Sequence, residues 1–176
     1  MHPLVTLLII IVLIVLYSKY ISNKKKKKQV LLTRVRNFVP TSKFVEDSGR
    51  FVISVDKKNK KVAIIISESQ KYCFKKDEII DIDIILDTET GLKGATPGVI
   101  IGGLIGGVKG SAIGGLITSN IKTKVKNVYL HLTISRSPNN INLPFMREAV
   151  KQNVNSILVK EAYERASMWK DKINSL

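Results

Sequence analysis

The chain opens with a long apolar run that differs from everything after it. Residues 4–17 read LVTLLIIIVLIVLY, in which Thr6 is the only polar residue, and no charge occurs before Lys19. As a helix, the first 18 residues would cover about 27 Å, close to the ~30 Å hydrocarbon core of a bilayer. This pattern predicts a single transmembrane helix over residues 1–21, followed by a basic juxtamembrane linker over residues 22–42.

The rest of the chain shows the alternation that is typical of half-buried strands. The runs RFVISVD and KVAIIIS, separated by KKNK, predict a β-hairpin over residues 50–67. Further strands are expected over residues 71–74, 79–86 and 121–136, with a short last strand at 141–143. Residues 145–173 repeat apolar positions every three or four residues, which predicts one long C-terminal helix. The expected fold class is therefore α+β.

Two of these strands carry complementary charges. Asp81, Asp83 and Asp87 share one parity of the fourth strand. Lysines at 122, 124 and 126 alternate in the same way on the next long strand. Antiparallel pairing would bring the two sets together, which favours neighbouring strands. A calcium site at these acids is the alternative, but the spacing of an EF-hand loop is absent.

The segment between those two strands is rich in glycine at a fixed spacing of four. One row runs through positions 98, 102, 106, 110 and 114, and a second row lies beside it. Each glycine in a helix costs about 0.8–1 kcal/mol relative to alanine, so such rows favour close helix packing. The predicted packing and oligomerisation residues are Gly98, Gly102, Gly103, Gly106, Gly107, Gly110, Ser111, Gly114 and Gly115.

This glycine-rich insertion, residues 91–120, has two other interpretations. Residues 106–111 read GGVKGS and superficially resemble a phosphate-binding loop, but Val108 and Gly110 break the required Gly-Lys-Ser/Thr adjacency. If the flanking strands pair, both ends of the insertion lie on one side, which excludes a full single span. A helical hairpin is then expected, either in lipid or buried against protein.

Charge is concentrated next to the apolar run. The chain has 29 Lys and Arg against 14 Asp and Glu, a net charge of +15, yet the first acid is Glu46. Five consecutive lysines follow the span: Lys24, Lys25, Lys26, Lys27 and Lys28. Basic residues flanking a span stay cytoplasmic. We therefore expect a single-pass protein of the bacterial inner (cytoplasmic) membrane, with its N-terminus outside and its C-terminal domain in the cytoplasm.

The same lysines are expected to meet anionic lipid headgroups at the membrane surface. The alternative interpretation is that the lysine run is only the signal that sets the topology of the span. A cleaved signal peptide has a basic start and a small-residue cleavage site, whereas this chain starts Met-His-Pro and leaves the run as Ser-Lys-Tyr-Ile-Ser-Asn-Lys, which argues against cleavage. Aromatic residues are few and are not interleaved with the lysines, so we expect no nucleic-acid partner.

No motif for catalysis or for a cofactor occurs. One cysteine, Cys73, and two histidines, His2 and His131, do not make a typical zinc site. His131 lies on the strand parity opposite to the apolar set, where a structural role is expected. We therefore expect a protein that is not an enzyme and that carries no cofactor and no metal.

The order of these features resembles a group of bacterial and prophage membrane-anchored proteins. The residues that carry the resemblance are the hairpin RFVISVDKKNKKVAIII, the segment YCFKKDEIIDIDII, the glycine insertion and KVKNVYLHLTI. The resemblance implies a pleckstrin-homology-like (PH-like) domain over residues 43–176: a bent antiparallel sheet, a C-terminal helix and the inserted glycine zipper. Such domains are similar to lipid- or peptide-binding modules, but fold alone does not fix function.

These observations together predict a membrane-anchored interaction protein that forms homo-oligomers through its glycine zipper. A protein partner on the PH-like domain is also compatible with the pattern. Envelope scaffolding and phage exclusion or defence are the processes considered, the second only through the resemblance. The alternatives are a pore-forming effector that inserts the glycine hairpin, and a lipid- or peptide-binding module.

Overall fold

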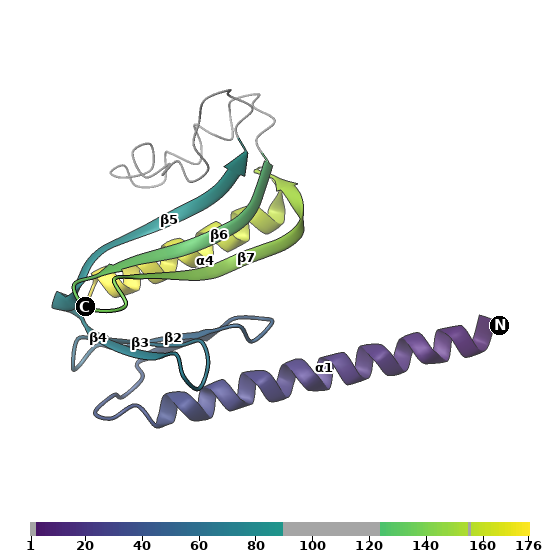
Figure 1. The fold of residues 1–176 in the computed structure, drawn as a ribbon, viewed down its shortest axis with the longest axis horizontal. Helices are drawn as coiled ribbons and strands as arrows, with labels where there is room; N and C mark the ends of the chain where they lie inside the picture. Colours follow the sequence, from purple (N-terminus) through teal and green to yellow (C-terminus); the bar gives the residue numbers. More distant parts are fainter. Residues whose placement is uncertain (1–2, 90–123, 155) are drawn as a thin grey trace. The chain divides into compact units, whose positions relative to one another are not determined.

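The computed structural model describes residues 3–89, 124–154 and 156–176. The chain divides into two compact units, residues 1–76 and residues 77–175. Each unit pairs one antiparallel sheet with one helix (Figure 1). The α+β class expected from the sequence is confirmed, with the strands in a four-stranded and a three-stranded sheet.

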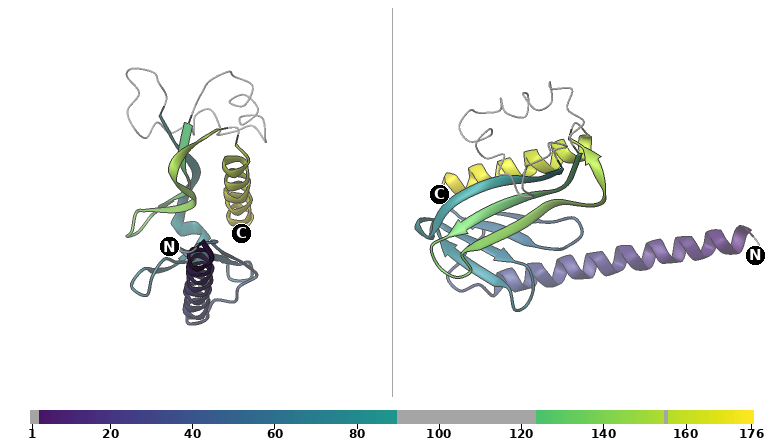
Figure 2. Two further views of the ribbon diagram at one scale, coloured as in Figure 1. Left: turned by 90° about the vertical axis from the view of Figure 1, so that its right-hand side faces the viewer. Right: turned by 45° about the horizontal axis from the view of Figure 1, so that its top comes forward.

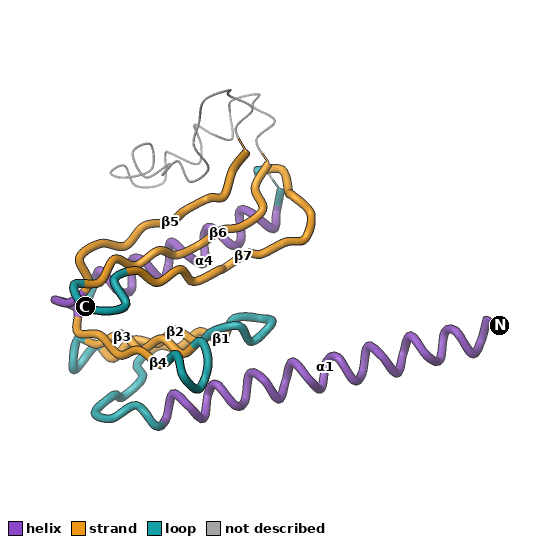
Figure 3. The backbone as a smooth tube through the Cα atoms, in the orientation of Figure 1, coloured by secondary structure: helices purple, strands orange, loops and turns teal. Residues whose placement is uncertain are grey.

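The first unit begins with α1, Pro3–Thr33, a single helix of 31 residues. Figure 3 shows it as one uninterrupted coil. No glycine or proline occurs from Leu4 to Thr33, so nothing in the sequence stops the helix where the apolar run ends. Among the described residues, α1 is the one helix long and apolar enough to cross a membrane, a test that an N-terminal signal sequence also passes. The lysine run is helical too.

Sheet A of the first unit contains β1 (Ser42–Val45), β2 (Val52–Asp56), β3 (Lys61–Ile65) and β4 (Lys71–Lys75), in that order and all antiparallel. The expected hairpin of β2 and β3 is confirmed. Strand β1 was not predicted, because four residues reading SKFV give no clear alternation. A short 3-10 helix, η1 (Lys76–Glu78), ends the sheet.

The connection from α1 to β1 is held against the end of the β2–β3 hairpin. Asn37 adopts a left-handed conformation (φ 52°) that reverses the chain after the helix. The Val39 amide donates to Asp56 Oδ2 at 2.7 Å, and Lys61 Nζ donates to the Asn37 carbonyl at 3.1 Å. Burial raises the pKa of Asp56, but hydrogen bonds from Asn59, Val39 and Lys58 outweigh it and lower the pKa.

The second unit contains sheet B, formed by β5 (Ile79–Glu89), β6 (Lys124–Ile134) and β7 (Asn140–Asn153), and the helix α4 (Ile157–Asn174). Helix α4 runs along this sheet (Figure 2). It begins at Ser156, whose side chain accepts from the Val159 amide, as N-cap residues do. Its buried stripe consists of Val159, Ala162, Ala166, Trp169 and Ile173.

The long helix expected over residues 145–173 is wrong in its first part. Strand β7 continues to Asn153, and the helix begins only at Ile157. Pro144, expected to start the helix, lies inside β7 opposite Tyr129, next to a register shift. Strand β7 is an edge of sheet B, and edge strands with irregularities are where proline is tolerated.

The expected pairing of the two charged strands is confirmed, but not the match of their charges. Strands β5 and β6 are antiparallel, yet Asp81 lies opposite Thr133, Asp83 opposite His131 and Asp87 opposite Asn127. The Asn127 amide donates to Asp87 at 2.7 Å, and Lys170 of α4 pairs with Asp83 at 3.2 Å. The three aspartates share one register that places them opposite residues 127–133, so the lysines at 124 and 126 lie beyond them along β6, and the one acid–lysine pair of the described register is Glu89 with Lys124.

Candidate functional site

The lysine run lies where α1 meets sheet A, and the helical period sorts its members. Lys28 is buried, Lys24 and Lys25 are half-buried, and Lys26 and Lys27 are exposed. Positions 24, 28, 31 and 32 fall on one face of α1, which is the face turned to the sheet. The five lysines, which the sequence analysis treated as one membrane-surface group, therefore differ in their exposure.

An apolar contact fixes the end of this face. Leu31 and Leu32 form a buried cluster with Val52, Ala63 and Ile65 of the hairpin strands. The surrounding side chains of Val35, Phe38 and Val45 pack against the same cluster. By contrast, the apolar first part of α1 has no buried residue. One helix thus has an exposed apolar part and a part that belongs to the core of the domain.

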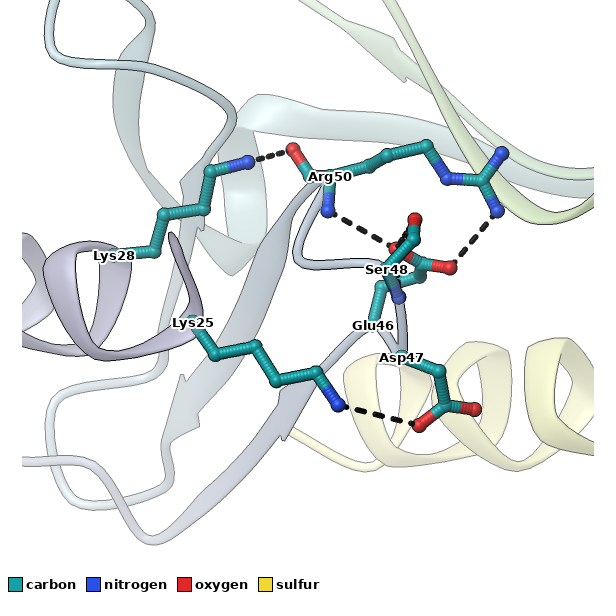
Figure 4. A network of polar contacts seen from close by, with 6 residues as sticks. All are labelled: Lys25, Lys28, Glu46, Asp47, Ser48 and Arg50. Carbon is teal, nitrogen blue, oxygen red and sulfur yellow. Dashed lines mark hydrogen bonds and ion pairs between the residues drawn. The ribbon is translucent and has the colours of Figure 1, made fainter. Parts of the chain in front are cut away.

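Lys28 is the polar centre of this contact. Its ammonium donates to the backbone carbonyl of Arg50, in the turn between β1 and β2 (Figure 4). The pKa of Lys28 is lowered from 10.5 to about 8, mainly by burial and also by nearby Lys24, while Glu46 opposes the shift. A buried ammonium is tolerated because the carbonyl and the carboxylate compensate part of its desolvation.

Glu46 organises the turn that receives Lys28. Its carboxylate accepts from the Ser48 hydroxyl at 2.6 Å, the Ser48 amide at 3.1 Å, the Arg50 amide at 3.0 Å and the Arg50 guanidinium at 2.8 Å. Burial raises the pKa of Glu46, but these hydrogen bonds outweigh it and lower the pKa from 4.5 to about 2. The carboxylate is therefore ionised at neutral pH, and it holds the turn in one conformation.

Gly49 makes the close approach of helix and turn sterically feasible. It has a φ of +65°, a conformation that favours glycine. A Cβ at this position would lie 3.3 Å from Lys25 Cγ, 3.4 Å from Lys24 Cγ and 3.4 Å from the Lys25 amide nitrogen. A Cβ here would therefore press on the Lys25 side chain and touch the helix backbone, and the positive φ would strain it. Gly49 was not singled out in the sequence, although EDSGR is a recognisable turn signal.

An exposed ion pair completes the junction. Lys25 Nζ lies 3.8 Å from Asp47 Oδ1, and the Asp47 side chain is 77% exposed. At this separation and exposure the pair contributes little to stability. Figure 4 shows that both lysine contacts reach the same turn, residues 46–50.

The chain, with its two sheets and C-terminal helix described, can be compared with known protein families. Residues 41–147 match the family of the glycine zipper containing PH domain. The chain belongs to this family. Neither the curated proteins nor the solved structures yielded a match.

Membership in the glycine zipper PH family confirms the PH-like domain and the glycine zipper that the sequence predicted. The matched range begins after α1, so the lysine run and the apolar helix are outside it. The nine zipper residues that the sequence singled out, between Gly98 and Gly115, lie outside the residues that the structure describes. Their role in packing remains a prediction.

The other candidate groups of this PH domain occupy structural positions. His131 is half-buried, with Nδ1 2.6 Å from Asn142 Oδ1 and Nε2 3.4 Å from the Thr133 hydroxyl. Within residues 3–89, 124–154 and 156–176, no group of three His, Cys, Asp or Glu side chains could hold a metal ion. The α1–turn junction is therefore the most developed polar arrangement that the described part of the chain offers.

Proposed function

We propose that this protein is a membrane-anchored interaction module that is not an enzyme. In this proposal α1 spans the bilayer, the PH-like domain lies at the membrane surface, and the glycine zipper drives self-association. The observation that supports this proposal is that α1 consists of two different parts. Its first part exposes apolar side chains and its last part is packed into sheet A.

The exposed apolar part supports a span. Leucines and isoleucines from Leu4 to Leu16 are about half exposed or more, for example Leu4 at 69% and Ile14 at 62%. An apolar helix of this length without a packed partner is unfavourable in water, and a bilayer supplies the missing environment. Tyr17 and Tyr20 stand at the end of the run, where interfacial aromatics are enriched.

The packed part argues against removal of the segment as a signal peptide. The helix continues without a break past residue 21 to Thr33, where Leu31 and Leu32 join the domain core. Processing of a signal needs a cleavage site with small residues. Here the region after the apolar run is helical and docked through Lys28 and Gly49. An uncleaved anchor makes use of both parts of the helix.

The exposed lysines support the orientation and a contact with anionic lipid headgroups. Lys26 and Lys27 are exposed and follow the apolar run by a few residues. Each basic residue near an anionic surface contributes about 1 kcal/mol to membrane attraction. The positive flank places the domain in the cytoplasm, which for a bacterial protein means the inner face of the inner membrane.

Self-association rests on the glycine spacing and on the family's zipper. Rows of small residues four apart let helix backbones approach closely in membranes. A homo-oligomer is the proposed product, and a protein partner on the PH-like domain would extend it. Envelope scaffolding and phage exclusion are two settings in which such an assembly would work, the latter only by resemblance.

The anchor and its orientation are tested with a reporter fused after Leu176 and with alkaline extraction of membranes. The protein should stay in the membrane pellet, and the reporter should be active only in the cytoplasm. Replacing the five lysines of 24–28 with glutamine should scramble the orientation. Release by alkali would refute the proposed membrane span, and reporter activity outside the cytoplasm would refute the proposed orientation.

Self-association is tested by crosslinking in native membranes. Gly106→Leu should abolish crosslinked species, because a large side chain holds the backbones apart, and Ser111→Leu should act likewise. Ile105→Leu is the matched control and should crosslink like the parent. If Gly106→Leu and Gly102→Leu both crosslink normally, the zipper does not mediate assembly. Dye release from liposomes would instead support a pore-forming effector.

A further inference from the structure

A small hollow lies between α1 and the turn at residues 46–50. Its volume is about 500 Å³. The helix contributes Tyr17, Ser22 and Lys25, and the turn contributes Asp47 and Ser48. All of these residues belong to the first unit, and the helix residues precede the range matched by the PH family. The hollow is thus a feature of the anchor and the domain together.

The lining changes from apolar to charged along the helix. Tyr17 and the neighbouring Ile21 belong to the end of the apolar run, whereas Lys25 lies one turn further into the basic run. If α1 spans the bilayer, as proposed above, this stretch lies at the level of the lipid headgroups. The inference therefore rests on the proposed span, and its natural ligand is the group found at that depth.

The charges of the hollow have both signs. Lys25 Nζ and Asp47 Oδ1 are 3.8 Å apart, beyond the range of a direct hydrogen bond, and the Asp47 side chain is 77% exposed. Gly49 lets the turn approach the helix here, since a Cβ at this position would lie 3.3 Å from Lys25 Cγ and 3.4 Å from Lys24 Cγ. An anion and a cation held side by side at a membrane surface complement a ligand that carries both charges.

We propose that this hollow binds a zwitterionic phospholipid headgroup of the phosphoethanolamine type. The Lys25 ammonium and the Ser22 hydroxyl donate to the phosphate. The Asp47 carboxylate accepts from the primary ammonium. Tyr17 and Ile21 lie where the glycerol and the first acyl carbons begin.

This assignment separates three headgroups by chemistry. A trimethylammonium group carries the same charge but has no N–H to donate to Asp47, so choline lipids lose a charge-assisted hydrogen bond. Phosphatidylglycerol lacks a cation altogether and places its phosphate beside an unneutralised carboxylate. The expected order of retention is therefore ethanolamine lipid first, then choline lipid and phosphatidylglycerol.

The test uses the full chain in vesicles that contain ethanolamine, choline and glycerol phospholipids in equal parts. After extraction in mild detergent, the retained phospholipids are quantified by mass spectrometry. The ethanolamine lipid should be enriched over the choline lipid by about fivefold, the preference that roughly 1 kcal/mol of one exposed charged contact supports. Asp47→Asn should return this ratio to that of the vesicles.

Glu68→Gln is the matched control, since Glu68 is an exposed acid in the β3–β4 turn of the same sheet. It should keep the enrichment, whereas Lys25→Gln should lower the total ethanolamine lipid retained. The proposal is overturned if the parent shows no enrichment, if Asp47→Asn behaves like Glu68→Gln, or if phosphatidylglycerol is retained most strongly. Sedimentation of the same vesicles is scored first: protein that does not sediment refutes the span, and protein that sediments without selectivity refutes only this site.

Discussion

The two α-helices in the described part of the chain pack on their sheets in different ways. Helix α4 packs on sheet B through five buried residues at a spacing of three or four, with Trp169 the largest. Helix α1 packs on sheet A through two buried leucines, and a buried lysine and a glycine in the opposing turn complete the contact. Buried apolar area therefore holds α4 on sheet B, whereas the packing of α1 on sheet A depends on a few specific polar and steric contacts.

The distribution of charge follows the same division. Residues 1–76 contain 17 Lys and Arg but only 4 Asp and Glu. Residues 77–175 contain 12 Lys and Arg and 10 Asp and Glu. The buried ionisable residues among those described are Lys28, Glu46 and Asp56, all in the first unit. We therefore expect the stability of the first unit to depend on pH and charge, and that of the second to depend on its apolar core.

Removing the main apolar residue of α4 should have the largest effect. Trp169 is 1% exposed, so Trp169→Ala leaves a large cavity and should lower the free energy of unfolding by about 3–5 kcal/mol. Urea denaturation followed by circular dichroism measures this loss. Met168→Ala is the control, since Met168 is 43% exposed on the same helix and should cost little. Equal losses in both variants would contradict apolar packing as the basis of α4 docking.

The docking of α1 should be broken by a side chain at Gly49. Gly49→Val forces a β-branched residue to φ +65°, which costs about 1–2 kcal/mol, and adds crowding against Lys24 and Lys25. The expected result is faster trypsin cleavage within the lysine run of the detergent-solubilised protein. Gly49→Asn tolerates the backbone conformation better and should be cleaved at an intermediate rate. Cleavage of Gly49→Val at the parent's rate would show that this contact does not hold the helix.

The stability of the first unit should rise at alkaline pH because of Lys28. Its pKa is about 8 in the folded protein and 10.5 in the unfolded chain, so the folded state binds fewer protons between these values. The unfavourable burial of the charge is fully present below pH 8 and disappears as the pH rises towards 10.5. Lys28→Met should lose this gain. Urea midpoints of parent and variant across that range measure it, and parallel curves would exclude the assignment.

The smallest effect is expected from replacing the glycine insertion. Glu89 lies opposite Lys124 in the β5–β6 pair, so the two ends of the insertion are already adjacent. The full chain with residues 90–120 exchanged for a short Gly-Ser linker should therefore keep its circular dichroism spectrum and its urea midpoint. Loss of folded signal would mean that the insertion belongs to the core of the PH-like domain.

The sequence predicted those elements whose periodicity is strong. The hairpin of β2 and β3 is visible because two apolar runs flank the polar turn KKNK, although both faces of these strands are buried, and the pairing of β5 with β6 is visible from their alternation. The boundary between β7 and α4 was misplaced, since Val150 and Ile157 fit a helical repeat but are 71% and 74% exposed. The spacing of apolar residues predicts a helix, but it does not show which of those residues are buried.

The α1–turn junction was hidden for a different reason. In sequence, Lys28 is one of five identical residues, and only the position of sheet A decides that this one is buried. Glu46 and Gly49 belong to a turn that the sequence predicts. The sequence of the turn does not show that α1 packs on it. Such long-range contacts between dissimilar residues leave no periodic signal.

The unbroken course of α1 has a mechanical consequence. Between Tyr17 and Leu32 the helix contains neither proline nor glycine, and sharp bends in helices need such residues or an inserted group. A span accommodates a thinner bilayer by tilting. Because the end of α1 is packed into sheet A, a tilt of α1 in the proposed span would be transmitted to the sheet as a rotation of similar size, so the thickness of the membrane would set the angle of the sheet.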